Sequence, residues 1–314
     1  MSQLESTLQE FLSTYTENNT LDEDDLKCLA RHALTSSDHF SHFCITAKIH
    51  KRPWKPRPIV SYCGSLLYGL GKWLDKQLQP IARQTAAYTS ISFELCTSLR
   101  KLKIDPSTDA LFTADAKSMY TNIDAAHALS VFRHFFSTHE LCHSIWSESD
   151  MILDALSLLM NNNLFQFGDT YWKQLDGTAM GAPPAPAYAT IYFAIHEIHI
   201  QNQFGNSLLF YRRYIDDAFA IWRSPANNPA ADTTNWHQFK QAMNAFGSLT
   251  WEVEDRSNSV NFMDLTISID NSRLTTKIFE KPQNLYLYLP FTSCHTPGVL
   301  KGTIIGMIYR HYAL

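Results

Sequence analysis

The chain has 314 residues, of which 45% are hydrophobic and 18% are charged, and its formal net charge is −4. This composition supports a sizeable core, but the mild acidity gives no overall sign of a nucleic-acid-binding protein, so such a role must rest on local charge. Six widely spaced cysteines without a CxxC pair argue against a disulfide framework or a structural zinc site. The N-terminal residues do not resemble a secretory signal, and no apolar run is long enough for a membrane span. We therefore expect a soluble, intracellular and nuclear protein.

The N-terminal part of the chain is expected to be helical up to residue 42. Thr20 and Glu23 form a T-x-x-E capping box, which predicts that a helix begins at Leu21. Residues 43–60 differ in character, because five basic side chains fall within ten positions and no acidic residue separates them: Lys48, Lys51, Arg52, Lys55 and Arg57. Three prolines in the same stretch favour an extended, turn-broken segment over a helix.

The rest of the chain alternates between helical and extended patterns. Apolar residues at helical spacing predict helices at 66–78, 125–136, 151–160 and 188–198. Short apolar runs predict a strand at 111–115, a hairpin at 208–222, and a second hairpin formed by 260–269 and 274–279. Residues 177–186 form a turn rich in glycine and proline. This mixture predicts an α+β fold with a mostly antiparallel sheet.

Three aspartates carry the main chemical prediction. Asp216 and Asp217 are expected at the tip of the first hairpin, since Asp tolerates the dihedral angles of tight turns. Two carboxylates there repel each other unless a cation lies between them. Asp115 ends a separate strand, so all three carboxylates converge if that strand neighbours the hairpin, and such a set suits Mg²⁺. Taken singly, the Asp pair is an ordinary turn and Asp115 is a helix N-cap or a loop residue.

Six segments, in order along residues 43–310, resemble the reverse transcriptases of Penelope-like retroelements. The sequence YIDD at 214–217 resembles the Y-x-D-D signature, and FTADAKSMYTNI at 112–123 resembles the motif with the first metal-binding Asp. The turn GTAMGAPPAP at 177–186 resembles the turn under the template and the incoming nucleotide. Segments similar to the Penelope-like branch are KIHK at 48–51 with RPIVS at 57–61, NFMDL at 261–265, and SCHTPGVLKG at 293–302.

The resemblance implies a right-hand polymerase fold with defined regions. These are an N-terminal extension at 1–42, fingers at 43–110, a palm at 111–280 that contains a fingers insertion at about 125–175, and a partial thumb at 281–314. It also implies two Mg²⁺ ions, replaceable by Mn²⁺, with ligands Asp115, Asp216, Asp217 and the backbone carbonyl of Ala116. Residues that would bind the deoxynucleotide are Lys48, Arg57, Tyr120, Met180 and Gly181. Residues that would contact nucleic acid are Lys51, Arg52, Lys55, Phe262 and Asp264.

Several of these roles have plainer alternatives. By resemblance, the ring of Tyr120 blocks the ribose 2′-hydroxyl and so selects deoxynucleotides, but it could equally pack within the palm. The basic stretch could be a solvated loop, and Phe262 with Asp264 could belong to an ordinary hydrophobic hairpin. Gly181 is expected to let the backbone approach the substrate closely. Arg256 is a weak candidate for the proton donor to pyrophosphate.

The predicted activity is RNA-directed DNA polymerisation on a primed RNA or DNA template, with deoxynucleotides as substrates and no membrane partner. Three rivals remain: an RNA-dependent RNA polymerase, an inactive domesticated nucleic-acid-binding scaffold, and a terminal transferase that needs no template. Penelope-like proteins usually continue through a full thumb and many carry an endonuclease domain. Because the sequence contains neither, we expect a weaker grip on the duplex. The chain is then a fragment, a domesticated remnant, or one subunit of a larger assembly with a separate endonuclease partner.

Overall fold

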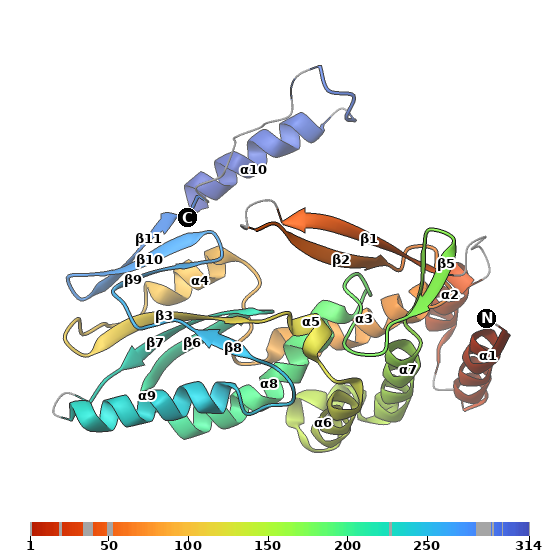
Figure 1. The fold of residues 1–314 in the computed structure, drawn as a ribbon, viewed down its shortest axis with the longest axis horizontal. Helices are drawn as coiled ribbons and strands as arrows, with labels where there is room; N and C mark the ends of the chain where they lie inside the picture. Colours follow the sequence, from red (N-terminus) through yellow and green to blue (C-terminus); the bar gives the residue numbers. More distant parts are fainter. Residues whose placement is uncertain are drawn as a thin grey trace. The chain divides into compact units, whose positions relative to one another are not determined.

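The structure is a computed structural model that describes residues 2–18, 21–33, 40–48, 53–225, 228–280, 290, 292–296 and 298–313. The chain forms two compact units, each assembled from three separate segments (Figure 1). The first unit comprises Met1–Tyr88, Ala116–Gln203 and Gln238–Glu252. The second comprises Thr89–Asp115, Phe204–His237 and Val253–Leu314. The boundary between them therefore falls within a strand, between Asp115 and Ala116.

Helices dominate the first unit. They are α1 (Ser2–Glu17), α2 (Glu23–Ala33), α3 (Tyr68–Gln84), α5 (Met119–Asn122), α6 (Ala125–Thr138), the 3₁₀ helix η1 (Glu140–Glu148), α7 (Ser149–Asn161) and nearly all of α8 (Ala185–Phe204). The four helices predicted from apolar spacing are confirmed by α3, α6, α7 and α8. The predicted start of α2 at Leu21 is wrong, because the Asp22 carboxylate accepts the Asp25 N–H at 2.7 Å and the helix begins at Glu23. Thr20 lies outside the described residues.

The first unit also contains a four-stranded sheet. Its strands are β1 (Ser41–Lys48), β2 (Lys55–Ser61), β4 (Leu164–Phe167) and β5 (Thr170–Lys173), in the order β2-β1-β4-β5. The predicted extended, proline-broken segment is confirmed as the antiparallel β1–β2 pair. Proline is tolerated there because β2 lies at the edge of the sheet, where a missing N–H breaks no ladder. The β4–β5 hairpin was not predicted from the sequence.

The second unit is built around the sheet β6-β7-β3-β8. Its strands are β3 (Asp109–Ala116), β6 (Leu208–Tyr214), β7 (Asp217–Arg223) and β8 (Trp251–Val253), and β8 lies on the boundary between the units. Strand β7 lies between β6 and β3 and is buried from Ala218 to Trp222, because both of its faces are covered. The predicted hairpin and its neighbouring strand are therefore confirmed.

A three-stranded antiparallel sheet and three helices complete the second unit. The strands are β9 (Ser259–Phe262), β10 (Leu265–Asp270) and β11 (Arg273–Ile278), and the helices are α4 (Ser92–Leu99), the first part of α9 (Pro229–Met243) and α10 (Val299–Ala313). The prediction of one strand over 260–269 is wrong, because a turn at Met263 and Asp264 divides it. The buried residues are at even-numbered positions before the turn, Val260 and Phe262, and at odd-numbered positions after it, Leu265 and Ile267. A turn within the segment explains this shift in the alternation.

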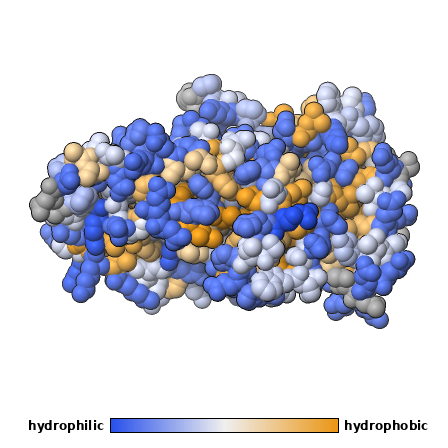
Figure 2. All heavy atoms as spheres, turned by 90° about the horizontal axis from the view of Figure 1, so that it is seen from below, coloured by the Kyte–Doolittle hydropathy of each residue, from blue (hydrophilic) through white to orange (hydrophobic). Residues whose placement is uncertain are grey.

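Packing in the second unit joins its two sheets. Phe219 and Ile221 on β7 share a buried cluster with Phe262 and Leu265, and Leu95 of α4 closes the same cluster. The face of the molecule in Figure 2 is mostly hydrophilic, with hydrophobic side chains visible between the polar ones. Across the helices that the structure describes, none is both long and apolar enough to span a membrane.

Candidate active site

The two carboxylates predicted to converge lie directly opposite each other on neighbouring strands. Asp115 on β3 is the cross-strand partner of Asp217 on β7 in the antiparallel ladder. Opposite residues in such a ladder share a face, with Cβ atoms about 4.5–5.5 Å apart. Both residues are exposed, whereas Ala114 and Ala218 beside them are buried. The sheet thus presents two like charges side by side at one end of a rigid apolar platform.

The third carboxylate, Asp216, lies in the turn that precedes β7. Tyr214 pairs with Asp217, so the loop between β6 and β7 has only two residues, Ile215 and Asp216. The expectation that an aspartate takes the unusual dihedral angles is wrong, since Ile215 has the left-handed φ of 53°. A β-branched residue in this region is strained by about 1–2 kcal/mol, so the turn persists because its surroundings impose it.

Arg213 contributes directly to that turn. Its side chain is only 2% exposed, and its Nη1 donates a hydrogen bond to the carbonyl oxygen of Ile215 at 2.7 Å. Its own carbonyl accepts the N–H of Thr89, which ties β6 to the start of the second unit. Hydrogen bonds from a charged donor in a buried setting are strong, and this one fixes the strained residue next to Asp216.

The β9–β10 hairpin packs on the face of the sheet that carries the aspartate pair. Asp217 and Phe219 are two residues apart on β7 and therefore share a face, and the Phe219 and Phe262 rings are 5.7 Å apart. Phe262 is 3% exposed, so its ring belongs to the core and does not lie open to a nucleic acid. Asp264 is half-exposed, with its carboxylate 4.0 Å from the guanidinium of Arg310.

The residues around Asp115 and Asp217 suit a hard divalent cation by their chemistry. Mg²⁺ favours carboxylate oxygens and usually takes one or two of them, keeping waters and substrate oxygens for its other positions. Asp115 and Asp217 supply such a pair, and a cation would relieve their repulsion. Over the described ranges, no three or more His, Cys, Asp or Glu side chains are gathered closely enough to enclose a metal by themselves. Two carboxylates at one end of the sheet match the share of ligands that Mg²⁺ usually takes from a protein.

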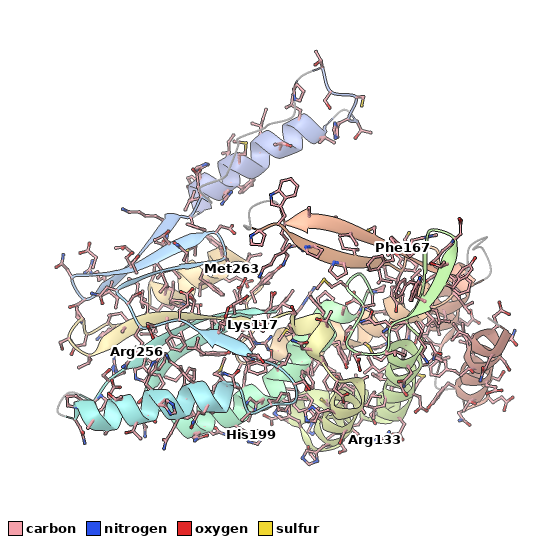
Figure 3. All side chains as sticks on the ribbon, viewed as in Figure 1. Lys117, Arg133, Phe167, His199, Arg256 and Met263 are labelled. Atoms are coloured by element: carbon pink, nitrogen blue, oxygen red, sulfur yellow. The ribbon has the colours of Figure 1, made fainter. Side chains whose placement is uncertain are left out.

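The second segment of the first unit begins immediately after Asp115, and the chain changes direction sharply there. Ala116 ends β3 with 2% exposure, and Ser118 takes a left-handed φ of 48° just before α5. Lys117 lies between them (Figure 3) and forms an ion pair with Glu252 of β8 at 2.5 Å. Tyr120 follows on α5 and is half-buried.

Three segments predicted to hold the nucleotide are joined by backbone hydrogen bonds within the first unit. The N–H of Thr178 donates to the carbonyl of Tyr120 at 2.6 Å, and the N–H of Val60 donates to the carbonyl of Met180 at 2.7 Å. Gly181 has a φ of 115°, and a Cβ there would lie 2.3 Å from the carbonyl oxygen of Val60. The backbone of β2 therefore approaches Gly181 closely, while the expected close approach of substrate to this glycine stays a prediction.

Three of the predicted basic residues gather on one face of the first unit's sheet. Lys48 lies opposite Lys55 across the β1–β2 pair, and Arg57 is two residues further along β2 on the same face. Like charges placed opposite each other are destabilising unless an anion joins them. Lys51 and Arg52 lie outside the described residues.

Arg256, the candidate proton donor, takes part in a buried cluster at the other end of β7. Its Nη1 donates to the Asp232 carboxylate at 2.8 Å, and its guanidinium lies 4.9 Å from the centre of the Trp236 ring. Trp222, which shares Asp232 as an acceptor, is five residues from Asp217, or about 16 Å along a strand that rises about 3.3 Å per residue. These contacts hold α9 against the sheet.

The sequence reading missed two residues that position the site, Arg213 and Thr178. The signal for Arg213 was present, because a cation at an inward-facing position of an apolar strand requires a buried partner. Thr178 carries no such signal, since its contribution is a backbone N–H.

The chain matches no family model, and no curated protein is similar enough in sequence to count as a relative. Solved structures do resemble it. Apo telomerase from Candida tropicalis, truncated from its C-terminal domain, gives a TM-score of 0.53 at 11% identity over 78% of this chain and 56% of that one. Telomerase from the same organism in complex with the TWJ fragment of telomeric RNA gives 0.54 at 12% identity over 91% and 51%.

A viral enzyme shares the same fold. The BmCPV RNA-dependent RNA polymerase in its quiescent state gives a TM-score of 0.52 at 12% identity, covering 84% of this chain and 26% of that one. The chain thus spans about half the length of the telomerases it matches and a smaller share of the viral polymerase. At such identities the likeness concerns the fold alone. The predicted α+β fold, with the fingers and palm of a nucleic-acid polymerase, is confirmed.

Proposed function

We propose that this protein is a reverse transcriptase that extends a primer 3′-hydroxyl with deoxynucleotides on an RNA template. The observation that carries the proposal is the pairing of Asp115 with Asp217 across β3 and β7, next to Asp216 in a strained two-residue turn. Like charges directly opposite each other depart from the usual pairing in a ladder, and such departures are expected where function and not folding selected the residues. Motif order along the chain supports a relationship to Penelope-like enzymes.

The proposed roles divide between the two units. In the second, Asp115, Asp216 and Asp217 hold two Mg²⁺ ions, which, when bound, activate the attacking oxygen and stabilise the leaving pyrophosphate. The carbonyl of Ala116, the residue of the first unit that is bonded to Asp115, is a further ligand. The β9–β10 hairpin, with Asp264 at its turn, supports the primer on the same face of the sheet. Phe262 contributes from within the core by fixing that hairpin.

In the first unit, Lys48 and Arg57 bind the triphosphate, because cations that share one face of a sheet suit a polyanion. Lys55 holds the template backbone, a contact that is independent of sequence and sensitive to salt. The ring of Tyr120 excludes the ribose 2′-hydroxyl, and Met180 supports the base. Catalysis then comes from positioning and charge, since the 3′-oxygen bonds to the α-phosphorus while the bond to pyrophosphate breaks.

The decisive experiment is extension of a DNA primer annealed to an RNA template, with wild type and Asp115→Ala compared at several Mg²⁺ concentrations. We expect Mg²⁺-dependent extension that the variant loses, with deoxynucleotides strongly preferred to ribonucleotides. Unchanged extension by Asp115→Ala would contradict the assigned site. If the protein binds the primed template but does not extend the primer under any condition, the inactive nucleic-acid-binding scaffold is favoured.

RNA-dependent RNA polymerisation is the second candidate, because the viral polymerase of that class shares the fold. Tyr120 separates the two, since a ring against C2′ leaves no room for a hydroxyl. We expect Tyr120→Ala to raise ribonucleotide incorporation relative to deoxynucleotide incorporation, while Tyr188→Phe on α8 leaves the ratio unchanged. A preference of the wild type for ribonucleotides would replace the first proposal by this one.

A further inference from the structure

A cavity of about 190 Å³ lies within the first unit, where α8 meets the ends of α3 and α6. Helix α8 supplies Ala194, Glu197, Ile198 and Gln201, which recur at helical spacing and so share one face of the helix. A cavity of about 150 Å³ is large enough to hold benzene, so this one has room for a substituted benzene ring. None of the described residues that line it belongs to the proposed active site.

The walls of this cavity favour positive charge. Glu197 is only 2% exposed, and Glu140 adds a second carboxylate at the exposed start of η1. The cavity also lies at the C-terminal ends of two helices, because α3 ends at Gln84 with its C-cap at Thr85, and the C-cap of α6 is His139. The last carbonyl groups of a helix carry a partial negative charge, which stabilises a cation placed within about one turn of them. Among the described residues that line the cavity there is neither a Lys nor an Arg.

An aromatic pair forms the α6 side of the cavity. The ring centroids of Phe135 and His139 lie 4.6 Å apart, and Phe135 is 4% exposed. The Nδ1 atom of His139 accepts the backbone N–H of Leu141 at 3.2 Å, so this nitrogen carries no proton and the ring is neutral in this arrangement. The face of an aromatic ring attracts a cation, most strongly where water is excluded. The cavity therefore combines an apolar aromatic wall with acceptors of negative charge, which is the composition of a site for an organic cation.

We propose that this cavity binds a free small molecule with a compact organic cation, an amidinium or guanidinium group joined to a small apolar body. The apolar body packs against Phe135 and Ala194, and the charged group donates hydrogen bonds to Glu197. Glu197 already takes part in an interaction within the protein, but a carboxylate has about four acceptor sites and can also receive the N–H groups of a planar cation. The inference is independent of the proposed function, because this binding requires neither nucleic acid nor Mg²⁺.

The test compares three ligands of nearly the same shape and different charge: benzamidinium, which is positive, benzamide, which is neutral, and benzoate, which is negative. Each is titrated into the full chain in EDTA near neutral pH, and binding is measured by ligand-observed NMR. We expect benzamidinium to bind with a Kd below about 1 mM, benzamide to bind at least about tenfold more weakly, and benzoate not to bind. Equal affinity for benzamide and benzamidinium, binding of benzoate, or no binding of benzamidinium would overturn the proposal.

A guanidinium group could also come from an arginine side chain of a partner protein. The peptide acetyl-Gly-Gly-Arg-Gly-Gly-amide tests this source, and we expect it to bind more weakly than benzamidinium because its backbone has no place in a cavity of this size. Tighter binding of the peptide would overturn the assignment to a small molecule.

Substitutions locate the site. Ala86→Leu adds bulk at an exposed position of the cavity wall and should weaken benzamidinium binding at least about tenfold. The matched control is Ala126→Leu, at an exposed position of α6 outside the cavity, which should keep the affinity within about twofold. Equal affinities in these two variants would overturn the location.

The charge is tested by Glu197→Gln, which should weaken benzamidinium binding about tenfold and leave benzamide binding unchanged. If circular dichroism shows that this variant does not fold, Glu140→Gln at the exposed rim replaces it, with an expected loss of about threefold because solvent screens the carboxylate there. Equal losses for benzamidinium and benzamide, or no loss for either, would overturn the role of the carboxylates. Failure of primer extension in the wild type would leave this inference intact and contradict only the proposed function.

Discussion

Strands β3 and β7 form one ladder whose two ends treat charge in opposite ways. At one end Asp109 lies opposite Arg223, and at the other Asp115 lies opposite Asp217. Asp109 is 3% exposed and receives two hydrogen bonds from the Arg223 guanidinium, at 2.7 and 2.8 Å. Both pairs share a face of the sheet and are separated only by the pairs Leu111–Ile221 and Thr113–Phe219.

The comparison contrasts an end of the ladder that serves folding with the end at which we propose chemistry. The Asp109–Arg223 pair joins opposite charges within the ladder. The Asp115–Asp217 pair places two carboxylates of like charge side by side, an arrangement that a bound cation would stabilise. A local rule that holds at one end and fails at the other favours the proposed site.

The largest expected effect is on activity at the Asp115 end. Asp115→Asn keeps the shape of the side chain and removes the charge that would hold Mg²⁺, so we expect primer extension to fall at least about 10³-fold, roughly 4 kcal/mol of activation free energy. Asp109→Asn is the matched control on the same strand. Assayed at a temperature where it remains folded, it should retain extension within about threefold. Equal losses in both variants would mean that the ladder, and not the charge, was disturbed.

The free energy of unfolding should show the reverse order, with Asp109→Asn the more damaging of the two substitutions. Asp109→Asn leaves the Arg223 guanidinium without its anion, and we expect the free energy of unfolding to fall by about 2 kcal/mol in urea titrations. The loss is limited because the Arg223 side chain is 41% exposed and can be rehydrated. Asp115→Asn, measured in EDTA, should raise the free energy of unfolding by about 0.5 kcal/mol through loss of repulsion. A destabilised Asp115→Asn would show that its carboxylate has a structural role.

Lowering the pH should remove the contribution of the Asp109–Arg223 ion pair to the free energy of unfolding. Burial raises the pKa of the Asp109 carboxyl, but hydrogen bonds from Arg223 and from the Asp105 backbone outweigh it, so the pKa lies below its ordinary value. A lowered folded-state pKa gives stability that is present above the unfolded pKa of about 3.9 and is lost as the pH falls through the folded value. The stability difference between wild type and Asp109→Asn should therefore be constant from pH 5 to 7 and shrink below about pH 4. A difference that does not shrink at all as the pH falls below about 4 would exclude the ion pair as its cause.

The sequence predicted that Asp115 lies close to the YIDD turn, because the strand and the hairpin that carry these residues each have a local pattern of apolar residues. Periodicity located the strands, and the resemblance supplied their neighbourhood. Periodicity does not encode which residue in the turn bears the strain. The pattern suggested Asp216 or Asp217, whereas the register left Ile215 at the left-handed position.

Features that depend on distant backbone could not be read from the sequence. Gly181 was recognised as special, but only the fold shows that β2 is the backbone lying against it. The β4–β5 hairpin escaped prediction because its four-residue strands are short, and β5 is exposed throughout. Strands of that length show too little alternation to distinguish them from a loop.

The smallest expected effect concerns the strained residue Ile215 in the β6–β7 turn and asks whether its strain affects primer extension. Ile215, with a φ of 53°, and Asn271, with a φ of 45°, are each the first residue of a two-residue turn in the second unit. Glycine at Ile215 relieves about 1 kcal/mol of strain and loses a similar amount through the freedom of the unfolded chain, so Ile215→Gly should change stability by less than about 0.5 kcal/mol. Asn271→Gly should also change stability by less than about 0.5 kcal/mol, because Asn already tolerates this conformation. Only Ile215→Gly should lower primer extension, by about threefold, because a looser turn lets Asp216 and Asp217 depart from the position that Arg213 helps to fix. If Asn271→Gly has the same effect, the loss reflects general flexibility of the second unit, and the strain at Ile215 has no special part in positioning the carboxylates.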